Sequence, residues 1–190
     1  MIPARWRIPL FALLCAAQLA LAVSIIVGAE RVLEQGELWR FRTEPVDPVD
    51  IVRGRYVALR FEATSGPIAP GATLPEDGVG FAVLEADEEG FARVKQVWAS
   101  RPTGGAYLYV NLTSVSETTA DFEFPVDRFY MPEEQAPIAE RLDREARSEG
   151  RGTWAEIRVH EGDAILEQLY IDGVPAGEAA QQAPTEPPQP

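Results

Sequence analysis

The chain has 190 residues, with 30 acidic against 17 basic side chains and a formal net charge of −13. Arg5 and Arg7 are the only charged residues before Glu30, so the remainder is two charges more negative than the whole. An acidic domain of this kind repels phosphate backbones and anionic lipid headgroups. The composition therefore excludes nucleic acid as a partner.

Metal and thiol chemistry are limited by the scarcity of cysteine and histidine. Cys15 is the only cysteine and His160 the only histidine, so one chain forms neither a disulfide nor a cluster of these ligands. Carboxylates remain the possible metal ligands. We expect no cofactor.

Residues 8–27 form an uninterrupted apolar segment. From Ile8 to Val27 there is no charged residue, and a helix of this length reaches about 30 Å, the thickness of the hydrocarbon core. The two preceding arginines place the N-terminus in the cytoplasm. The sequence thus predicts a cytoplasmic stub and membrane anchor over residues 1–29. The lipid bilayer is the first expected partner.

A cleaved signal peptide is the alternative interpretation of this segment. Ala20-Leu21-Ala22 resembles a cleavage site, but cutting there would leave the apolar residues 23–27 exposed to water. The apolar stretch is also longer than the usual ~7–15 residues of a signal peptide. We favour an anchor that stays uncleaved.

Small residues recur at every fourth position of the anchor. Such spacing lets two helix backbones approach closely within a membrane, although an alanine-rich span also produces it by chance. The sharper hypothesis is a packing face for a partner's membrane helix, formed by Ala12, Ala16, Ala20, Ser24 and Gly28.

Residues 30–175 read as a globular domain rich in β-strands. Apolar and polar residues alternate with the period of half-buried strands. We expect a short helical turn near Asp47–Gly54, a loop over Ser65–Gly78, and seven or eight antiparallel strands. The strand segments are Glu37–Thr43, Arg55–Glu62, Val79–Ala86, Phe91–Trp98, Tyr107–Val115, Ala120–Tyr130, Trp154–His160 and Ala164–Ile171.

One amphipathic helix is expected outside the anchor, over Pro137–Arg147. Its thin apolar stripe of Ile138, Leu142 and Ala146 suits a helix that covers a sheet. Residues 176–190 are rich in Pro, Gln and Ala, which predicts a disordered tail. The predicted fold class is mainly β (α+β): an N-terminal transmembrane helix followed by an antiparallel β-rich extracytoplasmic domain.

Several short motifs occur together in a fixed order. Arg53-Gly54-Arg55-Tyr56-Val57-Ala58-Leu59-Arg60-Phe61 resembles the signature Gly-Asp-Tyr-x-x-Leu-x-Tyr of the membrane-anchored bacterial family called GDYXXLXY. The segments Arg128–Glu133 and Leu169–Gly173 also resemble that family, whose role is uncharacterised. The residues that carry the resemblance are Gly54, Arg55, Tyr56, Leu59, Phe61, Tyr130, Pro132, Asp172 and Gly173.

Two departures from the family signature favour a structural or interaction role for it. Arg55 stands where the family has aspartate, and Phe61 where it has tyrosine. A catalytic or metal-binding aspartate does not tolerate reversal of its charge, and a ring kept without its hydroxyl indicates packing.

Other candidate sites each have a plainer structural interpretation. The acidic residues Asp77, Glu85 and 87–89 suggest calcium, but they lack the spacing of a calcium loop, so we expect a solvated hairpin tip. The remaining candidates have equally plain roles. We expect Glu133 and Glu134 to cap a helix, His160 to lie at an exposed hairpin, and Lys95 to be a mid-strand residue and not the base of a peptidase. We expect four aromatic residues to pack in the core and not to line a ligand groove: Tyr56, Tyr107, Tyr109 and Phe129.

These observations predict a single-pass protein of the bacterial cytoplasmic (inner) membrane with its C-terminal domain outside. We expect an accessory or interaction subunit docked on a multi-span membrane partner. The first alternative is an extracytoplasmic ligand-binding module, which needs a concave apolar pocket. A membrane-tethered hydrolase is a third, which needs buried, adjacent carboxylates.

Overall fold

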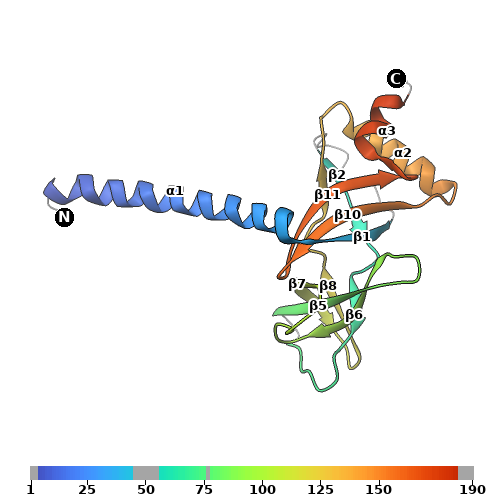
Figure 1. Cartoon of the computed structure of the whole chain (residues 1–190), viewed down its shortest axis with the longest axis horizontal. Helices are drawn as coiled ribbons and strands as arrows, with labels where there is room; N and C mark the ends of the chain where they lie inside the picture. Colours follow the sequence, from blue (N-terminus) through green and yellow to red (C-terminus); the bar gives the residue numbers. More distant parts are fainter. Residues whose placement is uncertain (1–3, 45–55, 76–77, 184–190) are drawn as a thin grey trace.

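The computed structural model describes residues 4–44, 56–75 and 78–183. It begins with one long helix, α1 (Ala4–Gln35), which extends away from a globular β-rich domain (Figure 1). Its stretch from Ile8 to Gln35 is long and apolar enough to cross a membrane. The predicted span therefore lies within a helix that continues two turns beyond Val27.

Gly36 alone separates α1 from the first strand, β1 (Glu37–Glu44). The Gly36 N–H donates to the Val32 carbonyl at 2.9 Å, which completes the last helical turn. The predicted strand over Glu37–Thr43 is confirmed, and its alternating residues Trp39, Phe41 and Thr43 face inward.

A five-stranded sheet and two helices form what we call the helical lobe. The strand order is β12-β11-β10-β1-β3, so β1 extends the sheet made by the last hairpin of the chain. The remaining elements of this lobe are β3 (Arg60–Phe61), β10 (Thr153–His160), β11 (Asp163–Ile171), β12 (Val174–Pro175), α2 (Ala136–Ser148) and α3 (Ala176–Gln182).

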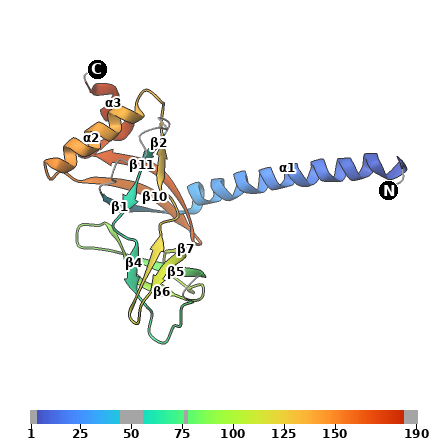
Figure 2. The same ribbon diagram turned by 180° about the vertical axis from the view of Figure 1, so that it is seen from behind.

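The middle of the chain forms a second sheet, which we call the barrel lobe (Figure 2). Its order is β4-β8-β7-β5-β6. Ile68 forms a parallel bridge with Val97, and the Ala69 N–H donates to the Val97 carbonyl at 3.0 Å, so the two edge strands close on each other. The strands are β4 (Ser65–Pro67), β5 (Gly78–Ala86), β6 (Ala92–Trp98), β7 (Tyr107–Val115) and β8 (Thr119–Glu123).

A two-stranded ribbon, β2 (Tyr56–Ala58) with β9 (Arg128–Tyr130), packs beside the helical lobe. It corrects two of the predicted strands, each of which breaks in two. The described part of the first, residues 56–61, divides at Leu59, whose N–H donates to the Asp127 carbonyl beside β9 at 2.8 Å, while residues 60 and 61 form β3 beside β1. Residues 120–130 likewise divide between β8 and β9.

Two further expectations change, and a third is not tested. The predicted loop over residues 65–78 contains β4, a strand of small residues that alternation does not reveal. The predicted disordered tail is wrong over residues 176–182, where α3 packs Ala176 and Ala180 into the core. Alanine provides little hydrophobic signal but allows close packing. The predicted helical turn over residues 47–54 lies outside the described residues.

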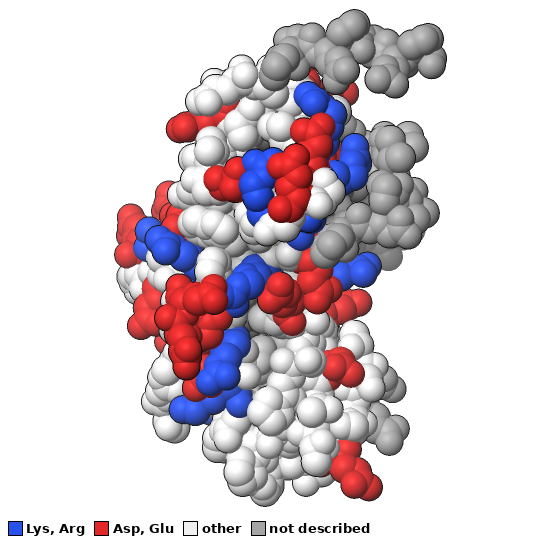
Figure 3. Space-filling view, turned by 90° about the vertical axis from the view of Figure 1, so that its right-hand side faces the viewer, with Lys and Arg blue, Asp and Glu red and all other residues white. Residues whose placement is uncertain are grey.

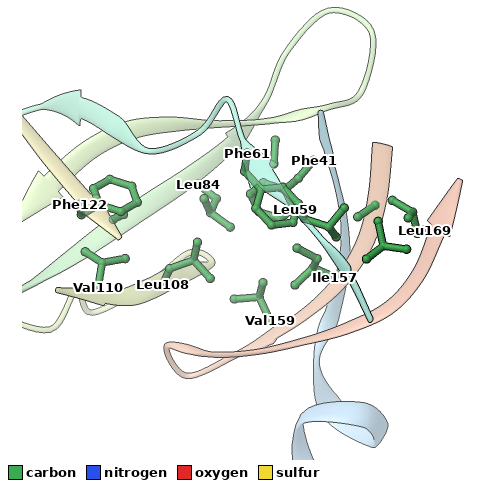
Figure 4. Packing of buried hydrophobic residues seen from close by; sticks show 14 of the residues in the cluster. Phe41, Leu59, Phe61, Leu84, Leu108, Val110, Phe122, Ile157, Val159 and Leu169 are labelled. Atoms are coloured by element: carbon green, nitrogen blue, oxygen red, sulfur yellow. The ribbon is translucent and has the colours of Figure 1, made fainter. Parts of the chain in front are cut away.

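The two lobes share one apolar core (Figure 4). At its centre three rings meet edge to face or tilted: Phe41 of β1, Phe61 of β3 and Phe124, which follows β8. The Phe61 and Phe124 rings are 4.2 Å apart, between centroids. These contacts tie strands of the helical lobe to the end of the barrel lobe, so the domain packs as one unit.

Candidate interaction surface

The junction between α1 and the domain is tightly packed. Val32 is only 3% exposed, and Arg158 of β10 donates to the Gly36 carbonyl at 3.1 Å while its Nε pairs with Glu167 at 2.9 Å. A Cβ on Gly36 would overlap the Val32 carbonyl oxygen. The direction of α1 relative to the sheet is therefore fixed by packing and hydrogen bonds.

Arg42 of β1 joins the two lobes through the β5–β6 turn, a contact we call the lobe clamp. Its guanidinium donates to Asp87 at 2.6 Å and to Glu89 at 2.8 Å, and it lies 4.1 Å from the centre of the Phe91 ring. The hydrogen bond from Arg42 lowers the pKa of Asp87. The same bond raises the pKa of Arg42.

Asp87 also orders its own turn. Its Oδ1 accepts the backbone N–H groups of Glu89 and Phe91 at 2.9 and 2.8 Å, the arrangement of a capped turn. The acidic tip is thus partly a structural contact, where we expected only a solvated loop. Within the described residues no group of His, Cys, Asp or Glu is arranged to hold a metal ion; Asp77 lies outside them.

The outer face of the helical-lobe sheet carries stacked aromatic and charged side chains. Trp154 and Tyr170 stack at 4.0 Å, and Arg40 lies over the Trp154 ring at 5.0 Å. The Tyr170 hydroxyl donates to Glu156 at 3.2 Å, and Arg40 approaches the same carboxylate at 3.6 Å. Burial, with this hydrogen bond, raises the pKa of Tyr170.

A groove of about 580 Å³ runs between β1 and the β5–β6 turn. Residues 37–40 of β1 line one side of it, and Ala86 and Gly90 line the other. Viewed from the end opposite α1, acidic and basic atoms lie side by side in a band across the domain, while the barrel lobe below shows few charges (Figure 3). The residues that line the groove are Glu37, Leu38, Trp39, Arg40, Ala86 and Gly90.

The structure pairs two distant motif segments directly. In the β2–β9 ribbon Tyr56 lies opposite Tyr130, with ring centres 5.9 Å apart, and Arg128 lies 5.1 Å from the Tyr56 ring centre. Leu59 and Phe61 are buried, which supports a packing role, whereas Tyr130 is 68% exposed. Gly54 and Arg55 lie outside the described residues.

The other motif residues shape chain reversals. The Pro132 carbonyl accepts the N–H groups of Gln135 and Ala136, which starts α2. Asp172 and Gly173 adopt left-handed φ values of 51° and 78° in the β11–β12 turn, and Arg151 pairs with the Asp172 carboxylate.

The row of small residues in α1 lies on the part of the helix that extends from the domain. All five are exposed in the single chain, and the Ser24 hydroxyl donates to the Leu21 carbonyl at 2.8 Å. Packing against a partner helix stays a prediction. The row comprises Ala12, Ala16, Ala20, Ser24 and Gly28.

The remaining candidate residues occupy structural positions. Helix α2 begins after Gln135, so Glu133 and Glu134 lie in the turn before it and not, as we expected, in its first turn. Lys95 lies on β6 with its amino group 4.0 Å from Glu85, and His160 ends β10 half-buried opposite Asp163.

The four aromatic residues considered for a ligand groove differ in burial. Tyr107 is buried, Tyr56 and Phe129 are half-buried, and Tyr109 is exposed. Tyr107 and Tyr109 both contact the Phe81 ring edge to face. The expectation of core packing therefore holds for Tyr107 and not for Tyr109.

The protein belongs to the class in which an apolar N-terminal helix is joined to a β-rich domain. Its sequence also matches a known protein family. A family model described as GDYXXLXY protein matches residues 18–169. The chain therefore belongs to the GDYXXLXY family. No curated protein and no solved structure matches the sequence significantly.

Proposed function

We propose that this protein is an accessory subunit of the bacterial cytoplasmic membrane, which docks its outer domain on a multi-span membrane partner. The carrying observation is the direct junction of α1 with the domain. A tether that only retains a domain near the membrane works through a flexible linker, whereas this junction sets the orientation of the domain.

The proposed topology follows from the helix and its flanking charges. Residues 8–27 span the bilayer, Arg5 and Arg7 remain in the cytoplasm, and the acidic domain lies outside. The eight helical residues from Gly28 to Gln35 then extend about 12 Å at 1.5 Å per residue. This length holds the domain close above the membrane surface at a fixed height.

Docking in this proposal uses two surfaces of the same rigid body. The small-residue row of α1 packs on a membrane helix of the partner, and the outer domain contacts the partner's extracytoplasmic part. Because the junction is ordered, binding at one surface positions the other, and the entropic cost of the second contact is reduced. A flexible junction would lose this advantage.

The test inserts a flexible linker of six Gly and Ser residues between Gln35 and Gly36. Crosslinking in native membranes, followed by mass spectrometry, should recover a multi-span protein with the wild type and much less of it with the insertion. The matched control places the same insertion between Gly104 and Gly105, in an exposed loop, and should retain capture. Equal capture by both variants contradicts the role of the junction.

Topology has its own measurement. In a Cys15→Ser background, a cysteine introduced by Glu88→Cys should react with a membrane-impermeant maleimide in intact cells or spheroplasts. A cysteine introduced by Arg5→Cys should react only after the membrane is opened. The reverse labelling pattern would place the domain in the cytoplasm and remove the proposal.

A further inference from the structure

Among the described residues, the first five residues of strand β1 are paired with a strand on one side only. Residues Glu37–Arg42 pair with β10, while β3 pairs with β1 only at Thr43 and Glu44. Within the described part of the chain no strand pairs with the other side of residues 37–41. An unpaired strand edge is a template for another strand.

The direction of the free backbone groups follows from one hydrogen bond. The Glu62 N–H donates to the Arg42 carbonyl at 3.2 Å, so the peptide groups of Arg42 point toward β3. In a strand both main-chain groups of a residue point to the same side, and alternate residues share that side. Leu38 and Arg40 therefore direct their N–H and C=O groups to the open edge.

The groove described above lies along this edge. It has apolar walls at Leu38 and Trp39, and its far side is the β5–β6 turn. That turn is fastened to β1 by the lobe clamp at Arg42. Since four residues of strand extend about 13 Å, the edge from Glu37 to Arg40 offers room for a short added strand.

The charge of the groove rim indicates the chemistry of the occupant. The clamp neutralises part of the acidic turn, and Arg40, which also lines the groove, lies 3.6 Å from the Glu156 carboxylate. Glu37 and Glu88 are exposed carboxylates at or beside the groove. They favour an extended segment that carries basic side chains. Leu38, which is 45% exposed, favours an apolar side chain directly opposite.

Chain direction identifies the source of the segment. Strand β1 continues away from the end of α1 (Figures 1 and 2), so in the proposed topology it runs away from the membrane. An antiparallel neighbour must then run toward the membrane. A second copy paired in this way would direct its own α1 away from the bilayer, which excludes antiparallel self-association through this edge.

We propose that an extracytoplasmic segment of the multi-span partner, descending toward its next membrane helix, adds to β1 as an antiparallel strand. This inference rests on the proposed function and specifies the contact that the outer domain makes. Hydrogen bonds to Leu38 and Arg40 supply the main-chain recognition. Side chains at alternate positions of the added strand contact Leu38 and the acidic rim.

The first test separates backbone from side-chain recognition in the full-length protein. Arg40→Pro removes an N–H that points to the open edge and leaves the β1–β10 ladder intact. It should reduce capture of the partner at least tenfold in native membranes. The matched control Arg40→Ala removes the side chain but keeps the N–H, and should stay within twofold of wild type. Equal loss in both variants overturns recognition through the backbone.

The second test reads the direction of the added strand. Photo-crosslinking residues are placed singly at positions 38 and 40, and the adducts are mapped by mass spectrometry. Both should map to one segment of one membrane protein, with the adduct from position 38 lying C-terminal to that from position 40. The opposite order, or two separate segments, overturns the antiparallel arrangement. A probe at Tyr130, on the β2–β9 ribbon, should give no adduct with that segment.

The two proposals fail in distinguishable ways. If wild type captures a multi-span partner that the linker insertion abolishes, while Arg40→Pro keeps full capture, the accessory role stands and the strand addition is overturned. If wild type captures no membrane partner, both are overturned. Arg40→Pro must retain wild-type resistance to proteolysis. Should it unfold, Leu38→Pro repeats the test at the other open N–H, and its capture should fall well below that of Leu38→Ala, which loses only the side-chain contact.

Discussion

The two lobes of the domain use β-structure in opposite ways. In the barrel lobe the edge strands β4 and β6 meet, and Gly66 lies so close to Val94 that an added Cβ would overlap its side chain. In the helical lobe no described strand pairs with the second side of β1 along residues 37–41. The barrel lobe brings its two edge strands together. In the helical lobe, by contrast, β1 keeps main-chain N–H and C=O groups that no described strand pairs with.

In the proposed function, this difference separates a supporting part of the domain from the part that contacts the partner. Closure removes the exposed edges through which strands associate, so the barrel lobe supplies a stable wall for the groove. The helical lobe joins α1 directly and presents the open edge. The three-ring cluster of the core and the lobe clamp connect the two lobes. A substitution in either connection tests how strongly the lobes depend on each other.

The largest effect is expected from Phe41→Ala. Phe41 is fully buried and contacts Phe61 and Phe124, so its loss should lower the free energy of unfolding by about 3–5 kcal/mol. Because the cluster is shared, both lobes should unfold in one transition at lower denaturant. Urea unfolding of the detergent-solubilised chain, followed by tryptophan fluorescence and circular dichroism, measures this. Two separate transitions would show that the lobes are independent.

A smaller effect is expected from Gly66→Ala in the barrel lobe. The added methyl group overlaps Val94 where the barrel closes, and overpacking of this kind costs about 1–3 kcal/mol. Gly104→Ala is the control, because a Cβ there meets nothing within 4 Å, and its unfolding midpoint should stay near wild type. Equal midpoints for both variants would mean that the barrel edges are not tightly closed.

The sequence predicts the long strands of this structure better than its short elements. Long strands, such as β10 and β11 of the last hairpin, alternate clearly, and the sequence predicts their bounds within a residue or two. The short strands β2, β3 and β9 were not separated, because the breaks at Leu59 and between residues 123 and 128 depend on partners far along the chain. Helix α3 was missed because it is built from Ala, Gly, Glu and Gln.

The interaction surface was less predictable than the fold. The motif residues Leu59 and Phe61 were correctly interpreted as packing positions. The lobe clamp was missed, although Arg42 stands at an outward position of a predicted strand and residues 87–89 form an acidic tip. Alternation predicts which way Arg42 faces, but not which turn lies opposite it. The open edge of β1 likewise depends on sheet order, which no local pattern contains.

Loss of the lobe clamp should destabilise the domain less than Gly66→Ala does. The pH dependence of stability tests this contact. Hydrogen bonding to Arg42 lowers the pKa of Asp87 below its ordinary value of 3.8. The stabilising contribution is therefore complete above that value and is lost as the pH falls through the lowered pKa. In thermal unfolding, wild type should lose this contribution as the pH falls below about 4, and Asp87→Asn should lack that part of the slope.

The control for the clamp is Glu88→Gln, which removes an exposed carboxylate outside it. This variant should keep the pH dependence of wild type, since the background of other carboxylates is shared by all three proteins. An Asp87→Asn curve parallel to that of wild type would show that the clamp does not hold the lobes together in solution.

The smallest effect on stability is expected at the open edge itself, from Leu38→Ala. Leu38 is 45% exposed on the outer side of β1, and substitutions at such positions usually change the free energy of unfolding by less than about 0.5 kcal/mol. Capture of the proposed partner should nevertheless decrease, because the Leu38 side chain would pack against the proposed added strand and not against its own domain. Urea midpoints and crosslinking yields from the same preparation compare the two effects directly. A loss of stability above about 1 kcal/mol would show that Leu38 belongs to the core of its own domain, and the open edge would then be a protected strand, not a contact surface.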